Sequence, residues 1–155
     1  MRPVTPQVAV DAIIELVDRP GRPIILIERK YPPHGWAIPG GFVDVGESLE
    51  TATVREALEE TSLHIRLKAL LGCYSDPARD HRGHTVSAIY VAEATGEPVA
   101  QDDAKALAVY NIGDQLPELA FDHQQVLMDY RNYLAGNRGV PVNFPARLKC
   151  EIEDE

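Results

Sequence analysis

The sequence lacks the features that mark membrane-spanning, secreted, fibrous or disordered chains. No apolar run is long enough to cross a membrane, and no apolar secretory segment follows the opening residues 1–6. Internal repeats and low-complexity tracts are absent as well. With 45% hydrophobic and 25% charged residues, the composition is ordinary for a globular protein. The 155 residues then predict one domain, which is long enough to bury a core of its own.

Cysteine is scarce. Cys73 and Cys150 are the only two, and they form no metal-type pair. The histidines show no zinc-type spacing either. This pattern predicts two free thiols in a reducing compartment, and we therefore expect a cytoplasmic protein.

Positive charge is also in short supply. The chain has 15 Lys and Arg residues against 24 Asp and Glu residues, which gives a formal net charge of −9. This balance argues against a protein that coats nucleic acid or docks on an anionic membrane. It also repels a phosphorylated substrate, unless a metal ion or local arginines offset the negative field.

What is present is a mixture of strand and helix patterns. Apolar, β-branched runs predict strands at Val8–Val17, Ile24–Lys30, Ile65–Tyr74, Thr85–Ala94 and Leu107–Ile112. A turn rich in proline and glycine joins the first two strands, so we expect them to form a hairpin. The mixture predicts an α/β sandwich, in which helices pack on both faces of a mixed sheet.

Two helices are predicted from their capping residues. Ser48 is a candidate N-cap for a helix over Leu49–Thr61, which contains neither glycine nor proline. Asp122 opens the last helix, with Gln125 at the capping-box position and Gly136 at its end.

The chain beyond the last helix has a different composition. It contains several prolines, and four of its last five residues are acidic. We therefore expect a single domain over residues 1–136 and a C-terminal surface tail over residues 137–155.

Acidic residues gather on the first predicted helix. Residues three and four apart share a helical face, so Glu56, Glu59 and Glu60 lie together. The opposite, apolar face is formed by Val54, Ala57 and Leu58. Carboxylates in such a group repel one another unless a cation lies between them, and they are the hard ligands that Mg²⁺ or Mn²⁺ prefers. The alternative interpretation is a solvated acidic helix face.

The wider spacing resembles the Nudix box, G-x5-E-x7-R-E-U-x-E-E-x-G-U, in which U is apolar. The matching residues are Gly41, Glu47, Arg55, Glu56, Ala57, Glu59, Glu60 and Leu63. Six fixed matches at this spacing arise by chance with a probability of roughly 10⁻⁵. Ser62 departs from the pattern, because the box has glycine there. A serine in the left-handed conformation costs roughly 1 kcal/mol, which a helix end tolerates.

The resemblance implies a Nudix hydrolase with a Nudix-like α/β/α sandwich. Such enzymes use Mg²⁺ or Mn²⁺ to hydrolyse the pyrophosphate of a nucleoside diphosphate linked to another group. Carried over by position, the metal ligands are Glu56, Glu60, Glu59 and the carbonyl of Gly40. The resemblance also makes Glu59 a candidate base, and it implies that Glu47 and Arg55 orient the set.

Residues outside the box bear on the substrate. Pro77 follows Ser62 by 15 residues and opens a run that contains Arg79 and Arg82. This run resembles the ADP-ribose pyrophosphatases of the Nudix family, which release AMP and ribose 5-phosphate. Both arginines have the chemistry to hold a phosphate or a ribose edge. The alternative is a solvated loop, in which they pair with the neighbouring aspartates 76 and 80.

Further candidates each have an ordinary structural alternative. The resemblance implies that Arg29 contacts a phosphate, and the alternative is a surface arginine. Trp36 and Tyr31 could stack on adenine, although a lone tryptophan is more often part of a core. The resemblance makes Asp103, with its neighbour at 102, a candidate catalytic or metal-binding acid, and the alternative is a cap or turn residue. His123 is expected to be a solvated or capping histidine.

Three functional hypotheses follow. The first is a metal-dependent ADP-ribose pyrophosphatase acting on a small nucleotide, and relatives of this type imply a homodimer. The second keeps the fold but hydrolyses nucleoside triphosphates, including oxidised ones. The third is a nucleotide or ADP-ribose sensor without catalysis, although such a sensor has no need for three intact glutamates.

Overall fold

The computed structural model describes residues 1–101, 104–137 and 139–145. The strands are β1 (Gln7–Leu16), β2 (Ile24–Arg29), β3 (Trp36–Ala37), β4 (Gly40–Phe42), β5 (Arg66–Tyr74), β6 (Thr85–Ala94) and β7 (Ala104–Tyr110). The helices are α1 (Leu49–Thr61) and α2 (His123–Leu134), with a 3-10 turn η1 (Pro77–Arg79). In the described ranges, no helix is long and apolar enough to cross a membrane.

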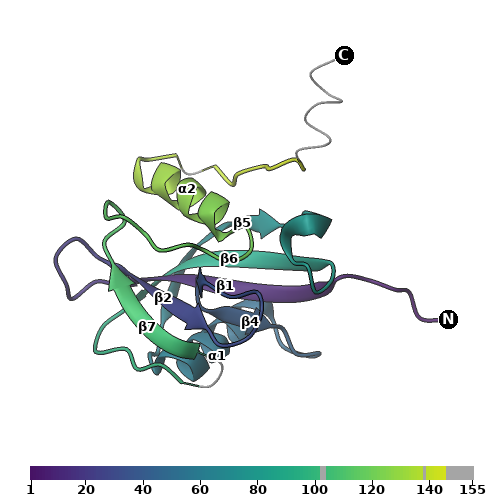
Figure 1. The fold of residues 1–155 in the computed structure, drawn as a ribbon, viewed down its shortest axis with the longest axis horizontal. Coiled ribbons are helices and arrows are strands. Elements are labelled where there is room, and N and C mark those ends of the chain that lie inside the picture. The colour runs from purple at the N-terminus through teal and green to yellow at the C-terminus, as the bar shows by residue number, and fades with distance from the viewer. Residues whose placement is uncertain (102–103, 138, 146–155) are drawn as a thin grey trace, which may run out of the picture.

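The strands form one mixed sheet around β1 (Figure 1). β1 pairs in parallel with β6 along its whole length. Its other edge pairs antiparallel with β4 from Ala9 to Asp11, and with β2 at Glu15, which completes the predicted hairpin. The two cavities described below are lined by residues of β2 and β4 that face each other along this edge.

Successive side chains of β1 point to opposite faces of the sheet. Ala12, Ile14 and Leu16 pack in a core with Ala57 of α1. Ile13 packs in a second core with Val126, Leu127 and Tyr130 of α2. In Figure 1, α2 accordingly lies above the sheet and α1 below it. The predicted α/β sandwich with a mixed sheet is thus confirmed.

Helix α1 begins and ends at the predicted residues. The Ser48 hydroxyl accepts a hydrogen bond from the backbone N–H of Thr51, as an N-cap does. Ser62 ends the helix in the left-handed region with φ 64°, and its N–H donates to the Leu58 carbonyl. Leu58 itself is 38% exposed, so its predicted place on the buried face is wrong. The buried face is shifted round the helix and includes Ala52, Ala57 and Glu60.

The predicted capping box of α2 is wrong as well. Asp122 is the N-cap residue but makes no side-chain cap hydrogen bond. Gln125 does not reach back to it and instead donates to Asp129 at 3.1 Å. Asp122 instead accepts from Arg79, in the loop that follows β5, whereas the partner of Gln125 lies one turn further along α2 itself.

Residues 139–145 follow the outer side of α2, where the chain runs in yellow in Figure 1. Asn143 donates to the Asp129 carboxylate at 3.1 Å, and the Tyr74 hydroxyl donates to the same group at 2.7 Å. The ring of Pro141 lies over Gly72, where a Cβ atom would be 3.2 Å from it. This part of the predicted tail therefore contacts both α2 and β5.

Candidate active site

Gly40 and Gly41 allow two carboxylates to approach the backbone of β4. A Cβ atom at Gly41 would lie 2.4 Å from the carboxyl carbon of Glu56. A Cβ atom at Gly40 would lie 2.2 Å from Oδ1 of Asp11 and 2.1 Å from the carbonyl oxygen of Val10. Glycine at these two positions therefore leaves the space that both carboxylates occupy.

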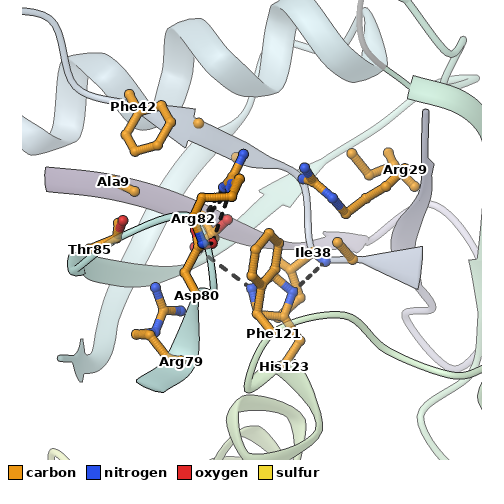
Figure 2. Close-up of a pocket in the computed structure, with 15 residues that line it drawn as sticks. Ala9, Arg29, Ile38, Phe42, Arg79, Asp80, Arg82, Thr85, Phe121 and His123 are labelled. Carbon is orange, nitrogen blue, oxygen red and sulfur yellow. Dashed lines mark hydrogen bonds and ion pairs between the residues drawn. The ribbon is translucent and has the colours of Figure 1, made fainter. Parts of the chain in front are cut away.

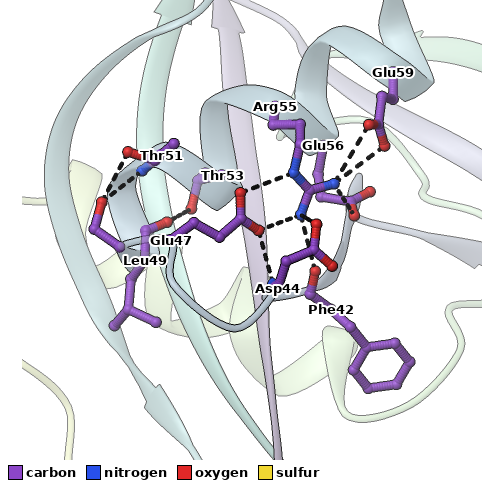
Figure 3. A network of polar contacts seen from close by, with 10 residues as sticks. Phe42, Asp44, Glu47, Leu49, Thr51, Thr53, Arg55, Glu56 and Glu59 are labelled. Atoms are coloured by element: carbon purple, nitrogen blue, oxygen red, sulfur yellow. Dashed lines mark hydrogen bonds and ion pairs between the residues drawn. The ribbon is translucent and has the colours of Figure 1, made fainter.

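Arg55 connects the acidic residues of the box (Figure 3). Its guanidinium pairs with both carboxylate oxygens of Glu47 and donates to Glu56 at 2.8 Å. The contacts to Glu59 are longer, 3.3 and 3.4 Å. The hydrogen bonds from Arg55 and from the backbone N–H of Asp44 lower the pKa of Glu47 to about 2. Arg55 therefore braces Glu47 and Glu56 more closely than Glu59.

Glu56 and Glu60 line one cavity with Gly40, Gly41, Arg29 and Arg82, which we call the carboxylate cavity. Glu60 is 8% exposed and accepts a hydrogen bond from the Gly40 N–H at 3.0 Å. Burial, assisted by the charges of Glu56 and Asp11, raises the pKa of Glu60 to about 8. Burial also raises the pKa of Glu56. A buried and a partly buried carboxylate that repel each other are a donor set that fits a divalent cation.

The third glutamate of the helix lies apart from this pair. The Glu59 side chain is 45% exposed and does not line the carboxylate cavity. Among the described residues, no three His, Cys, Asp or Glu side chains are grouped closely enough to hold a metal ion. The fit to a cation thus rests on two carboxylates, and Gly40 contacts Glu60 through its N–H group.

A second cavity adjoins the first and is shown in Figure 2. We call it the arginine cavity, because Arg29, Arg79 and Arg82 all line it. The space between its lining residues, including the open mouth, is about 460 Å³. The three arginines that the sequence analysis proposed as substrate-binding residues come from two distant segments, and they lie together in this cavity.

The three arginines differ in their partners. Arg79 forms a two-pronged pair with Asp122, at 3.0 and 2.8 Å, and its side chain is 4% exposed. Arg82 forms a similar pair with Asp80. Arg82 thus forms the aspartate pair that the alternative interpretation expected while also lining the cavity, whereas Arg79 pairs with a residue from the start of α2.

Arg29 makes one hydrogen bond to the described part of the chain, from Nε to the carbonyl of Pro33 at 2.8 Å. Burial and the neighbouring charge of Arg82 lower its pKa. Two nearby cations, one of which has no carboxylate partner among the described residues, form a natural place for an anion.

Aromatic side chains cover these arginines. The Phe121 ring lies 4.8 Å from the guanidinium carbon of Arg29 and 5.4 Å from that of Arg82, while Phe42 lies 5.7 Å from Arg82. Phe121 has φ 56°, which is uncommon for a bulky residue. Neither phenylalanine was nominated from the sequence, since nothing in its local pattern separates it from a core residue.

Other nominated residues occupy different places. Trp36 packs against the core beside α2 with its ring edge-on to Tyr110, and it lines neither cavity. Tyr31 lines the carboxylate cavity and is exposed. Pro77 is the first residue of η1, whose N-cap Asp76 accepts from the Ala78 N–H. Asp103 and its neighbour at 102 lie outside the described residues.

Asp11 and His123 were missed by sequence reasoning, and both line the arginine cavity. Asp11 is 9% exposed and accepts a hydrogen bond from the Ser87 hydroxyl at 2.6 Å; burial raises its pKa to about 7. His123 is 2% exposed rather than solvated, and its ring accepts from the Ile38 N–H at 3.0 Å. Burial lowers the pKa of His123 to about 4.

The structure is an α/β sandwich in which two carboxylates that could hold a cation lie beside a pocket lined by arginines, an arrangement that suits a hydrolase. The NUDIX domain model matches residues 5–130. The chain is 46% identical to an ADP-ribose pyrophosphatase of Methanocaldococcus jannaschii over 134 residues, which cover 84% of this chain and 76% of that protein. The chain therefore belongs to the Nudix hydrolase family, whose members use divalent metal ions.

Two solved structures are similar in fold. One is the NUDIX domain of Shewanella oneidensis NrtR complexed with ADP ribose, with a TM-score of 0.74 and 28% identity over 84% of this chain and 90% of that one. The other is a bifunctional NMN adenylyltransferase/ADP ribose pyrophosphatase from Francisella tularensis, complexed with AMP and a Mn ion. It has a TM-score of 0.71 and 27% identity over 83% of this chain and 42% of that one.

Proposed function

We propose that this protein hydrolyses ADP-ribose to AMP and ribose 5-phosphate, with Mg²⁺ or Mn²⁺ as its metal ion. The observation that carries the proposal is the position of Arg29 and Arg82, which line both the carboxylate cavity and the arginine cavity. A pyrophosphate held by these two arginines lies next to Glu56 and Glu60, while the arginine cavity is open to the group that the pyrophosphate carries.

Glu56 and Glu60 are the residues that would hold the cation, with Glu59, the Gly40 carbonyl and Asp103 as further candidates. A divalent cation in this place supplies positive charge to the pyrophosphate oxygens and makes the attacking water more acidic. Arg55 keeps Glu47 and Glu56 in position through its hydrogen bonds. Burial of Glu60 strengthens its attraction to a cation, because little water competes there.

Charge favours ADP-ribose over a nucleoside triphosphate. Of the three arginines in the arginine cavity, Arg79 and Arg82 are already paired with carboxylates. Asp11 adds a further acidic group to the same cavity. A pyrophosphate that joins two neutral sugars suits this limited positive charge better than three consecutive phosphates do. The relatives named as ADP-ribose pyrophosphatases support the same substrate.

The remaining parts of the proposal concern the setting of the enzyme. Cys73 is a free, exposed thiol, which is compatible with a reducing cytoplasm. The division into a domain over 1–136 and a tail, and the homodimer, stay predictions.

A turnover screen tests the proposal. ADP-ribose, NADH, dinucleoside polyphosphates and (d)NTPs are compared side by side with Mg²⁺, with Mn²⁺ and in EDTA. We expect ADP-ribose to have the highest kcat/KM and EDTA to abolish turnover. In Glu56→Gln and Glu60→Gln, kcat is expected to fall by roughly two decades, or about 3 kcal/mol.

Glu97→Gln is the matched control, because Glu97 is an exposed glutamate paired only with Arg19 in the described structure. It is expected to leave kcat unchanged. Tenfold better turnover of 8-oxo-dGTP or dATP than of ADP-ribose would establish the triphosphate hypothesis instead. Full binding of ADP-ribose without turnover would establish the sensor.

A further inference from the structure

The arginine cavity contains two buried polar side chains to which the proposed function assigns no contact with the substrate. Asp11 belongs to β1 and His123 is the first residue of α2, so the fold brings them together from distant parts of the chain. Both line the cavity while being almost inaccessible from bulk solvent, at 9% and 2% exposure. Buried polar groups normally have hydrogen-bond partners, so any hydrogen-bonding capacity that these two side chains leave unused indicates what a ligand could supply.

The hydrogen bond to Ile38 fixes the tautomer of His123 (Figure 2). A backbone N–H can only donate, so Nδ1 of the ring must be the acceptor. The neutral ring then carries its proton on Nε2. Within the described residues, Nε2 has no hydrogen-bond acceptor in range, since its nearest carboxylate oxygen, Oδ2 of Asp11, is 4.0 Å away.

Asp11 has the complementary capacity. Its Oδ2 accepts from Ser87, but a carboxylate offers about four acceptor sites in total. Its Oδ1 is packed against Gly40, which leaves Oδ2 as the oxygen that faces His123. The pair thus presents one donor and one acceptor to the cavity across a gap too wide for a direct hydrogen bond.

We propose that Asp11 and His123 together bind a neutral part of the substrate that donates one hydrogen bond and accepts another. The inference rests on the proposed function, because it assigns a specificity to the same site. A sugar hydroxyl satisfies both side chains with one oxygen at about 2.8–3.0 Å from each. The amino edge of adenine satisfies them with its amino group and the neighbouring ring nitrogen.

A phosphate group does not fit this pair. An ionised phosphate has no proton to donate to Asp11, and its charge is repelled by the carboxylate. The phosphates are therefore directed towards Arg29 and Arg82, and the neutral end of the substrate towards Asp11 and His123. A ligand that lacks the matching group leaves Nε2 of His123 and the remaining acceptor capacity of Asp11 unused, and this kind of mismatch gives strong discrimination.

Binding measurements without turnover test this assignment. Isothermal titration in EDTA compares wild type, Asp11→Asn and Asp11→Ala. The ligands are ADP-ribose, AMP, purine riboside 5′-monophosphate, 2′-deoxy-AMP, 3′-deoxy-AMP and ribose 5-phosphate. We expect Asp11→Ala to weaken binding of ADP-ribose and AMP by about tenfold or more. Purine riboside monophosphate lacks the amino group, and each deoxy nucleotide lacks one hydroxyl.

The analogues identify which group is bound. If adenine is the partner, Asp11→Ala causes no loss of affinity for purine riboside monophosphate. If a sugar hydroxyl is the partner, Asp11→Ala causes no loss of affinity for one of the two deoxy nucleotides, but it still weakens binding of ribose 5-phosphate. Glu15→Gln is the matched control. Glu15 is a buried carboxylate of the same strand, bonded to Tyr130 and Lys68 away from the cavity. Its replacement is expected to lower the unfolding temperature without any ligand-selective change.

The negative results have different meanings. Equal losses for all ligands in Asp11→Ala, or no loss for any, would make Asp11 a structural residue and overturn this inference alone. Failure of the wild-type protein to bind AMP both in EDTA and with Mg²⁺ would overturn this inference, whereas absence of ADP-ribose turnover in the Mg²⁺ screen would overturn the proposed function.

Discussion

At the scale of single residues, the two glycines of β4 matter for the space that they leave. A Cβ atom at Gly41 would meet the carboxylate of Glu56, which is the end of a flexible side chain. A Cβ atom at Gly40 would meet the carbonyl oxygen of Val10 at 2.1 Å, which is backbone of the central strand. Since a side chain moves more easily than a strand, a substitution at Gly41 is expected to affect catalysis, and one at Gly40 is expected to affect stability.

We predict that Gly41→Ala folds normally but displaces Glu56, with kcat reduced by about tenfold or more. Gly40→Ala is predicted to lose about 3 kcal/mol of unfolding free energy, because the overlap requires a backbone shift. Gly113→Ala is the control, since a Cβ atom there has no neighbour within 4 Å. Urea unfolding and turnover are measured on the same samples. Equal stabilities for the two β4 variants would contradict the distinction.

Single residues also show how far the sequence could predict the site. The resemblance to the Nudix box implied that Glu47 and Arg55 orient the acidic residues, and the motif could be found because it lies within one turn-and-helix segment. Asp11 and His123 carry no such signal: one lies within a strand and the other was expected to be solvated. Their meeting depends on β1 passing beneath the start of α2, and this contact between distant segments has no local signature.

At the scale of elements, the N-cap side chain of α2 binds the neighbouring loop rather than capping its own helix. Asp122 occupies the N-cap position, but its carboxylate accepts hydrogen bonds from Arg79, the last residue of η1. Sequence propensity predicted the helix and its first residue, but the partner of the capping side chain is decided by packing. The Ser48 cap of α1 lacks a competing arginine and forms as predicted.

This difference between the two helices predicts a coupling. Asp122→Asn and Arg79→Gln are each expected to destabilise the protein by about 3 kcal/mol, because each leaves a partly or fully buried charge without its partner. The double variant is expected to lose less than the sum by at least about 1 kcal/mol. Ser48→Ala is expected to lose about 1 kcal/mol, as loss of an ordinary cap does. Urea unfolding curves give all four values. Additive losses would show that Asp122 acts through the helix alone.

At the scale of the whole molecule, a net charge of −9 surrounds a site that concentrates further carboxylates. Burial raises the pKa of Asp11 from 3.8 to about 7 and that of Glu60 from 4.5 to about 8. At pH values between the unfolded and the folded pKa of each group, the folded protein holds a proton that the unfolded chain has released. The unfolding free energy therefore falls as pH rises. His123 acts in the opposite sense from pH 4 to 6.5, because there only the unfolded chain takes up its proton.

Above pH 6.5 the two carboxylates alone determine the sign. In EDTA we predict that the unfolding free energy falls between pH 6.5 and 8, by at most about 1.4 kcal/mol per pH unit for each group. A cation that binds the ionised carboxylates reverses this trend, since its stabilising effect grows as their protons leave. Urea unfolding in EDTA and in Mg²⁺ at both pH values measures the two slopes. Glu60→Gln removes one titrating group and one candidate ligand, so it is expected to show a shallower slope in EDTA and little response to Mg²⁺. If Mg²⁺ stabilised this variant as much as wild type and Glu97→Gln, the cation would bind elsewhere and Glu60 would be a buried structural residue.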